Sequence, residues 1–309
     1  MSATAIAKKQ ATWLAGYIPD VPTPFDPDGE VDLNAFRGLC ERQIQAGAPA
    51  LVVCETAGEA STLSPTEQER LIRTAVDVAQ ERTRVIAGAG SNSTSQAIEL
   101  TRRAEAAGAD AILSVVPYYN KPMQAGIIAH FRAIADSTRL PIILHDIPAR
   151  TVRELANDTL ARLAQSSQFI GLRDGSGDCS RPMSLGPLLP SHFRLLTGDD
   201  ATAVAYFASG GYGCVSTVSN IAPDLCRRIF SNERQGRLQI ACALHRQLMP
   251  LQICLSGINA PALKYALSLL GFMYPDTRLP IVELDETAKA AVARAVAGID
   301  EHQLTLANC

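Results

Sequence analysis

Two side chains that could carry chemistry, a histidine and an arginine, each lie near the end of a short apolar segment. His145 is the next-to-last residue of the run PIILHD, and Arg173 is the next-to-last residue of the run FIGLRD. A neutral imidazole accepts a proton near pH 7, whereas a guanidinium stays charged and binds carboxylates or oxyanions. Side by side, the two residues would form a general base next to a fixed positive charge.

Other apolar segments are also followed by polar side chains, several of which have an ordinary structural interpretation. The alternative role for Arg173 is a salt bridge with Glu55, Asp174 or a neighbouring residue. The alternative role for His145 is that of a hydrogen-bonded spacer. Glu59 is expected to hold a loop, and Asp199 and Asp200 to cap the helix that follows them. The full set is Glu55, Thr56, Glu59, Ser91, Asn92, Tyr118, Tyr119, Asn120, Asp146, Asp174, Thr197, Asp199, Asp200, Thr217, Ser219 and Asn220.

The elements that position these residues are repeated helix–strand units. Segments 45–53, 106–115 and 208–217 each read as a helix ending at glycine and followed by a buried parallel strand. The same template predicts eight strands, which favour a closed (β/α)8 TIM barrel over an open sheet; no GxGxxG or P-loop is present. The predicted strands are 16–23, 50–54, 84–89, 111–116, 141–145, 169–173, 193–197 and 213–217.

Helix-length segments with a period near 3.6 lie between these strands. Ser64-Pro65-Thr66-Glu67 opens one of them with a capping residue and a proline in the first turn. We expect residues 1–220 to form the barrel with a short N-terminal tail. Residues 221–309 are expected to hold the last barrel helix and a C-terminal extension of about three helices, which covers one flank or builds an oligomer interface.

The barrel brings the two reactive residues together. Side chains alternate along a strand, so if Ile143 and Gly171 point inward, His145 and Arg173 do so as well. Catalytic groups of such barrels lie at the carboxyl ends of the strands. His145 and Arg173 are therefore predicted to face one ligand from adjacent strands.

Composition favours a small-molecule partner. The chain has 309 residues, a net charge of -3 and 47% hydrophobic residues, so no excess of positive charge favours nucleic acid or a membrane surface. Its eight cysteines form no CxxC pair, which is typical of reduced thiols in a cytoplasmic protein. Neither a signal peptide nor an apolar run of eighteen residues is found.

Seven motifs resemble the dihydrodipicolinate synthase and N-acetylneuraminate lyase family of pyruvate-type class I aldolases. They occur in the family's order over roughly residues 16–275. The motifs are TAGE (56–59), PYYNKPMQAGIIAHF (117–131), PIILHDIPART (141–151), GLRDGSGD (171–178), GDD (198–200), GGYGCVSTVSN (210–220) and NAPALKYAL (259–267).

The resemblance implies a set of site residues. Thr56 and Tyr119 match the family's proton-relay threonine and tyrosine, and Arg150 matches an arginine that binds the second substrate's carboxylate. Ala57 stands where a second threonine usually helps to hold the pyruvate carboxylate. Two departures concern the chemistry itself, because Arg173 replaces the Schiff-base lysine and His145 replaces the proton-shuttling tyrosine.

The loss of the lysine removes the usual covalent mechanism. A guanidinium with a pKa above about 12 cannot lose its proton to attack a carbonyl. The five lysines are Lys8, Lys9, Lys121, Lys264 and Lys289, and only Lys121 is expected near the rim. A divalent metal held by Glu55, His145, Asp174 and Asp199 is an alternative, but metal sites usually contain several histidines.

The sequence thus predicts a lyase of the dihydrodipicolinate synthase type that acts on a 2-oxo acid such as pyruvate, without cofactor or metal. The resemblance implies 4-hydroxy-tetrahydrodipicolinate synthase activity and a homo-oligomer, either a tetramer or a dimer. Arg173, His145, Tyr119 and Thr56 are the predicted catalytic residues, and Arg150, Thr56 and Ala57 the predicted substrate-binding residues. The alternative is a pseudoenzyme that binds a keto acid or an amino acid without catalysis.

Overall fold

Eight parallel strands form the centre of the molecule in the computed structural model, which describes residues 12–256 and 259–307. The strand order is β1-β8-β7-β6-β5-β4-β3-β2, as expected for a TIM barrel. All eight predicted strands are confirmed within a few residues. They are β1 Gly16–Pro19, β2 Ala50–Val53, β3 Arg84–Gly88, β4 Ala111–Val115, β5 Ile142–Asp146, β6 Phe169–Asp174, β7 Arg194–Thr197 and β8 Gly213–Ser216.

The first strand is shorter than predicted but still helps to close the barrel. It pairs with β8 along its whole length, whereas the predicted strand continued to residue 23. Pro22 and Pro24 have no backbone N–H, so this segment cannot continue the ladder. The barrel closes on the other side through a parallel bridge between Asp20 and Val52.

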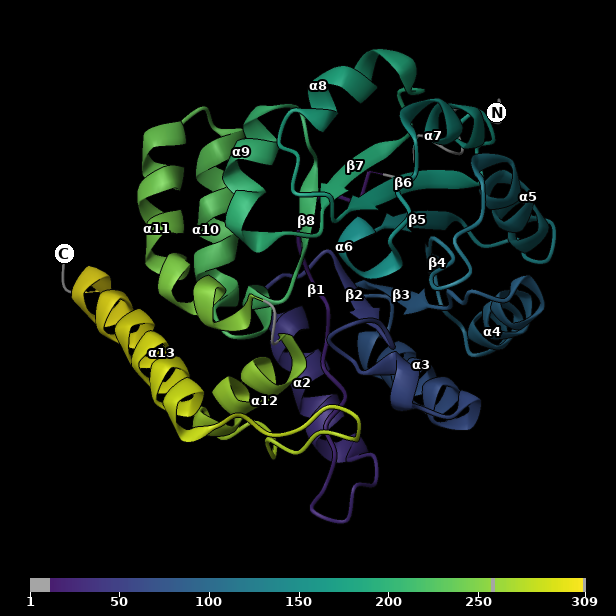
Figure 1. The fold of residues 1–309 in the computed structure, drawn as a ribbon. Helices are drawn as coiled ribbons and strands as arrows, with labels where there is room; N and C mark the ends of the chain where they lie inside the picture. The colour runs from purple at the N-terminus through teal and green to yellow at the C-terminus, as the bar shows by residue number, and fades with distance from the viewer. Residues whose placement is uncertain (1–11, 257–258, 308–309) are drawn as a thin grey trace.

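Helices surround the strands, as Figure 1 shows. Ser64 and Glu67 form the predicted capping box at the start of α3 (Pro65–Ala79), with Pro65 in its first turn. Short 3-10 turns η1 to η4 lie at 60–62, 186–188, 200–202 and 218–220. The barrel helices are α2 Leu33–Gln45, α3 Pro65–Ala79, α4 Thr94–Ala106, α5 Gln124–Ala135, α6 Pro148–Thr151, α7 Asn157–Leu163, α8 Arg181–Leu185, α9 Ala203–Ala208 and α10 Pro223–Arg234.

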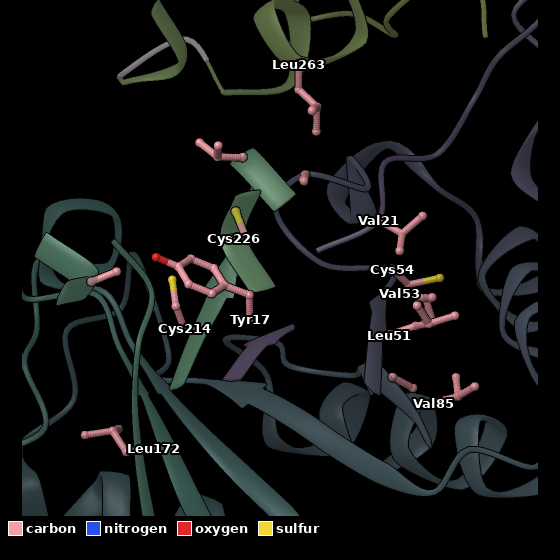
Figure 2. Packing of buried hydrophobic residues seen from close by; sticks show 14 of the residues in the cluster. Tyr17, Val21, Leu51, Val53, Cys54, Val85, Leu172, Cys214, Cys226 and Leu263 are labelled. Carbon is pink, nitrogen blue, oxygen red and sulfur yellow. The ribbon is translucent and has the colours of Figure 1, made fainter. Parts of the chain in front are cut away.

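Two apolar cores hold the fold together. One fills the barrel and includes Ile18, Val52 and Ile143. The other lies between the strands and the helices, where Figure 2 shows Tyr17 beside Cys214 and Cys226. Of the described cysteines, four are buried and all are free, and Cys309 lies outside the described residues. The reduced state of these thiols stays a prediction.

The C-terminal extension follows α10 and consists, in the described residues, of α11 Leu238–Leu255, α12 Asn259–Leu269 and α13 Glu286–Ala307. Figure 1 shows α12 and α13 along one flank of the barrel, on the side of α2 and α11. The predicted boundary at residue 220 coincides with the end of η4, although the division into two units stays a prediction. No helix among the described residues is long and apolar enough to cross a membrane.

Candidate functional site

His145 and Arg173 lie directly opposite each other on neighbouring strands. The β5–β6 register pairs Ile143 with Gly171 and His145 with Arg173, as the alternation argument required. Both side chains are buried at the mouth of the barrel, with exposed fractions of 1% and 4%. Buried polar side chains of this kind require partners or a ligand.

Glu55 joins the two residues into one network. Its Oε1 accepts a hydrogen bond from His145 Nδ1 at 3.0 Å, and its Oε2 accepts one from Arg173 at 2.9 Å. The hydroxyl and backbone N–H of Thr56 also donate to Oε2. The suggested salt bridge between Arg173 and Glu55 is therefore present. The suggested pairing with Asp174 is not found, because Asp174 contacts Arg181 at 2.9 Å instead.

Asp20 is the member of this network that the sequence analysis missed. It follows β1 directly, is fully buried, and contacts the Arg173 guanidinium through Oδ2 at 3.1 Å. Arg173 thus carries two carboxylates on its two terminal nitrogens. The signal for it in the sequence is a charged residue inside the otherwise uncharged start of the run YIPDVPTPF. We call Asp20, Glu55, His145 and Arg173 the mouth network.

Burial and the neighbouring charges set the protonation of the mouth network. Burial lowers the pKa of His145 despite the nearby Glu55, so its ring is neutral near pH 7. Burial opposes ionisation of Glu55, but its interactions with His145 and Arg173 outweigh that effect and lower its pKa. Burial raises the pKa of Asp20 to about 7, with Arg173 acting in the opposite direction. The neighbouring carboxylates hold the pKa of Arg173 above its usual value against the effect of burial.

Three buried atoms of the mouth network have no hydrogen-bond partner among the described residues. They are His145 Nε2, Arg173 Nε and Asp20 Oδ1. Because ionised Glu55 accepts from Nδ1, the imidazole Nε2 is left as a proton acceptor. A Cβ at Gly198 would lie 3.2 Å from Arg173 Nε, so a larger residue at this position would crowd the guanidinium. The site therefore offers one base, one cationic donor and one carboxyl oxygen.

Two cavities meet at the mouth network. One, of about 450 Å³, is lined by Asp20, Ala57 and Arg173 and extends toward β7, β8 and α11. The other, of about 500 Å³, is lined by Glu55 and His145 and extends toward β3 and β4. Thr56, Ile147 and Arg150 line both. His145 lines one cavity and Arg173 lines the other. A single ligand therefore contacts both residues, as expected, only if it lies where the two cavities meet.

The other predicted site residues are only partly gathered here. Thr56 and Ala57 lie at the mouth, where the Ala57 N–H points toward Asp20 Oδ2 at 3.5 Å. Arg150 lies in α6 and lines both cavities. Tyr119 lies apart, 90% exposed, with a left-handed backbone at φ 69°, and lines neither cavity. The role of Tyr119 in a proton relay stays a prediction.

The alternative chemistries gain no support from the described residues. Lys121 is exposed and lines neither cavity, while Lys8 and Lys9 lie outside the described residues. The four candidate metal ligands are not gathered, because Asp174 pairs with Arg181 and the Asp199 side chain accepts from the Ala201 N–H. Asp200 does not cap its helix as expected but reaches β8, where it accepts from Ser216 and from backbone N–H groups.

A second buried ion pair supports the loop that carries Thr56. Glu59 contacts the ammonium of Lys264 from α12 and accepts a hydrogen bond from the Arg278 N–H at 3.1 Å. The Lys264 ammonium and the Arg278 guanidinium lie 4.0 and 4.3 Å from the ring centre of Phe25. We call Phe25, Glu59, Lys264 and Arg278 the extension clamp. The prediction that Glu59 holds a loop is confirmed.

Comparison with known proteins agrees with this architecture. Residues 13–299 match the model of the dihydrodipicolinate synthetase family. The 4-hydroxy-tetrahydrodipicolinate synthase of Hyphomonas neptunium is 45% identical, over 92% of this chain and 99% of that protein. The one of Acidiphilium cryptum is 42% identical, over 92% and 98%.

Solved structures give the same result. The dihydrodipicolinate synthase of Aquifex aeolicus superimposes with a TM-score of 0.90 and 33% identity, over 93% of this chain and 98% of that chain. The chloride-inhibited synthase of Acinetobacter baumannii, solved in complex with pyruvate, has a TM-score of 0.89 and 37% identity, over 93% and 99%. This chain belongs to the dihydrodipicolinate synthetase family, whose members are lyases of the class I aldolase superfamily.

Proposed function

We propose that this protein binds a 2-oxo acid such as pyruvate without forming an imine, and that it catalyses lyase-type chemistry through the enolate of that acid. The observation that carries the proposal is the mouth network, in which a neutral imidazole and a guanidinium are opposed on adjacent strands. The family resemblance implies a tyrosine and a lysine at these two positions. The finer activity, 4-hydroxy-tetrahydrodipicolinate synthase, is the one named for its relatives.

Binding would use the polar groups that both cavities share. A carboxylate near Arg150 and Thr56 would lie at the boundary between the two cavities. The keto oxygen of the same acid would accept a hydrogen bond from Arg173 Nε, the guanidinium nitrogen without a partner among the described residues. The pyruvate complex of the Acinetobacter baumannii relative is consistent with a 2-oxo acid as ligand.

The chemical step would be proton abstraction. His145 Nε2 takes a proton from C3 of the bound oxo acid, and the electrons of the C–H bond move onto the carbonyl oxygen to form an enolate. Arg173 stabilises the oxyanion, an effect worth about 3–4 kcal/mol for a well-placed donor. General-base help of this kind contributes about 10² to 10⁴ in rate. The enolate carbon is then the nucleophile of an aldol-type reaction.

A second candidate function is noncatalytic binding of a keto acid or an amino acid. It is favoured by one observation, the pairing of both terminal nitrogens of Arg173 with Glu55 and Asp20. A guanidinium already neutralised by two carboxylates stabilises new negative charge less than a free one does. In that case the cavity retains a ligand but the enolate does not form.

Deuterium exchange at C3 of pyruvate distinguishes the two functions. NMR in D₂O is used to follow the wild type, His145→Gln and a matched control, His130→Gln, whose ring lies in α5 and hydrogen-bonds Thr94. We expect exchange by the wild type and the control, and a loss of at least about 100-fold in His145→Gln. If the wild type binds the acid but exchanges its C3 protons no faster than buffer does, noncatalytic binding remains as the function.

The predicted homo-oligomer and cytoplasmic location stay predictions.

A further inference from the structure

Asp20 is placed where a ligand of the proposed site must meet it. It lines the same cavity as Arg173, Thr56 and Ala57, and its side chain is fully buried. Its Oδ2 contacts Arg173 at 3.1 Å, and its Oδ1 has no partner among the described residues. One oxygen is thus tied to the cation of the site, and the other is buried without a partner.

The two carboxylates around Arg173 are held very differently. Glu55 receives hydrogen bonds from Arg173, from His145 and from Thr56. Asp20 has Arg173 at 3.1 Å and one long contact with the Ala57 N–H at 3.5 Å. When further negative charge enters this buried region, the carboxylate with the weaker support is the one that gives up its charge.

We propose that Asp20 takes up a proton when the carboxylate of a 2-oxo acid binds in this cavity, so that ligand binding at this site is coupled to protonation of Asp20. This inference rests on the proposed function. The net charge of the site does not change on binding, because the ligand anion and one proton enter together and the proton resides on Asp20. Arg173 then keeps one protein carboxylate, that of Glu55, and its interaction with Asp20 is replaced by one with the ligand.

The groups that face Asp20 have pKa values shifted away from pH 7, so Asp20 is the residue of this site that titrates near pH 7. Arg173 approaches it from β6, Glu55 from the loop after β2, and Cys54 from the end of β2. Burial raises the pKa of the Cys54 thiol, which therefore stays neutral. The pKa values of Glu55 and His145 are lowered, and that of Asp20 is raised to about 7. Protonated Asp20 would offer its O–H to a ligand oxygen.

This coupling predicts a specific pH dependence of ligand affinity. Below pH 7 Asp20 already carries its proton, so the Kd of pyruvate is nearly constant. Above pH 7 the proton must be taken from solvent, and Kd rises by up to about tenfold per pH unit, or roughly 30-fold between pH 6 and 8.5. Pyruvate itself remains ionised throughout this range.

The test is titration calorimetry of the full chain with pyruvate, at pH 6 in Mes and in Bis-Tris and at pH 8.5 in Tris and in borate. Because these buffers differ in ionisation enthalpy, the comparison counts the protons taken up. We expect close to one proton at pH 8.5 and close to none at pH 6. Asp20→Asn, which mimics the protonated acid, should bind about equally at both pH values and more tightly than the wild type at pH 8.5. Asp199→Asn is the matched control, because Asp199 lines the same cavity, and it should retain the proton uptake.

The outcomes separate this inference from the function on which it depends. Pyruvate binding by the wild type with no proton uptake at pH 8.5 overturns the role of Asp20 and leaves the proposed function standing. Uptake that persists in Asp20→Asn also overturns it. No pyruvate binding by the wild type at either pH overturns the proposed function and this inference together. The wild-type proton count stands on its own if Asp20→Asn does not fold.

Discussion

The mouth network and the extension clamp are two buried ion clusters that use similar residues for different purposes. Each sets a cation against a buried glutamate from the segment after β2, Glu55 in one and Glu59 in the other. In the clamp, Lys264 has an ion pair, a backbone carbonyl at 2.9 Å and an aromatic face. In the mouth network, Arg173, His145 and Asp20 each keep an atom without a partner among the described residues.

The difference indicates which cluster is built for a ligand. Glu59 also lines a cavity, but both of its oxygens have a contact: Oε1 with the Lys264 ammonium and Oε2 with the Arg278 N–H. The three unpaired atoms of the mouth network have neither a hydrogen bond nor an ion pair among the described residues, and such atoms beside a cavity indicate a missing partner. The clamp therefore fixes the loop that carries Thr56, and the mouth network holds the chemistry. Substitutions in the clamp should mainly lower the free energy of unfolding, whereas substitutions in the mouth network should change how that free energy depends on pH.

Removing the clamp cation should give the largest loss of stability. Lys264→Met leaves Glu59 buried without its counter-charge, which costs about 3–5 kcal/mol of unfolding free energy. Urea unfolding measures the loss. The double variant Glu59→Gln/Lys264→Met removes both charges and should recover more than half of it. A single variant that loses less than about 1 kcal/mol would mean that the pair is not the basis of the clamp.

Asp20 should make stability depend on pH. Its folded pKa of about 7 lies above the unfolded value of 3.8, so the folded state binds more protons between these values. The contribution of Asp20 is thus fully present below pH about 4 and is lost as pH rises through about 7, with an upper limit of about 4 kcal/mol. Unfolding of Asp20→Asn and wild type at pH 4.5, 6 and 7.5 should show the variant gaining relative stability as pH rises. A constant difference would show that Asp20 is ionised throughout.

Replacing Arg173 of the mouth network should lower the free energy of unfolding less than replacing Lys264 of the clamp. The size of the loss should also change with pH. In Arg173→Met, Asp20 can neutralise itself by taking a proton, and Glu55 keeps His145 and Thr56 as partners. We expect a loss of about 1–3 kcal/mol at pH 5.5 that increases at pH 8, where protonation of Asp20 is less favourable. Chemical unfolding at the two pH values provides the measurement, and an equal loss at both would remove the distinction between the clusters.

Restoring a lysine should give the smallest effect. Arg173→Lys places an amine between Asp20 and Glu55, and both carboxylates keep it protonated and therefore poorly nucleophilic. We expect slow but detectable borohydride trapping of pyruvate, and faster trapping in Arg173→Lys/Asp20→Asn, where one carboxylate is gone. Intact mass measures both adducts. Equal trapping rates in the two variants would mean that Asp20 does not control the charge at this position.

The sequence predicted the barrel better than the site, for a physical reason. Strand positions follow from local apolar runs and helix-ending glycines, so all eight were found, and the opposition of His145 and Arg173 followed from the alternation of side chains. The partners of these residues come from distant segments. Asp20 and Lys264 approach Arg173 and Glu59 only after the chain has closed on itself, and no local pattern encodes those contacts.

Borohydride treatment of the wild type with saturating pyruvate, followed by intact mass, tests the central claim most directly. The account predicts that pyruvate binds, as measured by calorimetry on the same sample, and that no covalent adduct forms. Arg173 has no nucleophilic amine, and Lys264, its amine fully buried in the clamp, lines neither cavity. A reduced adduct on any lysine would show that an imine forms after all and would contradict noncovalent binding at the mouth network.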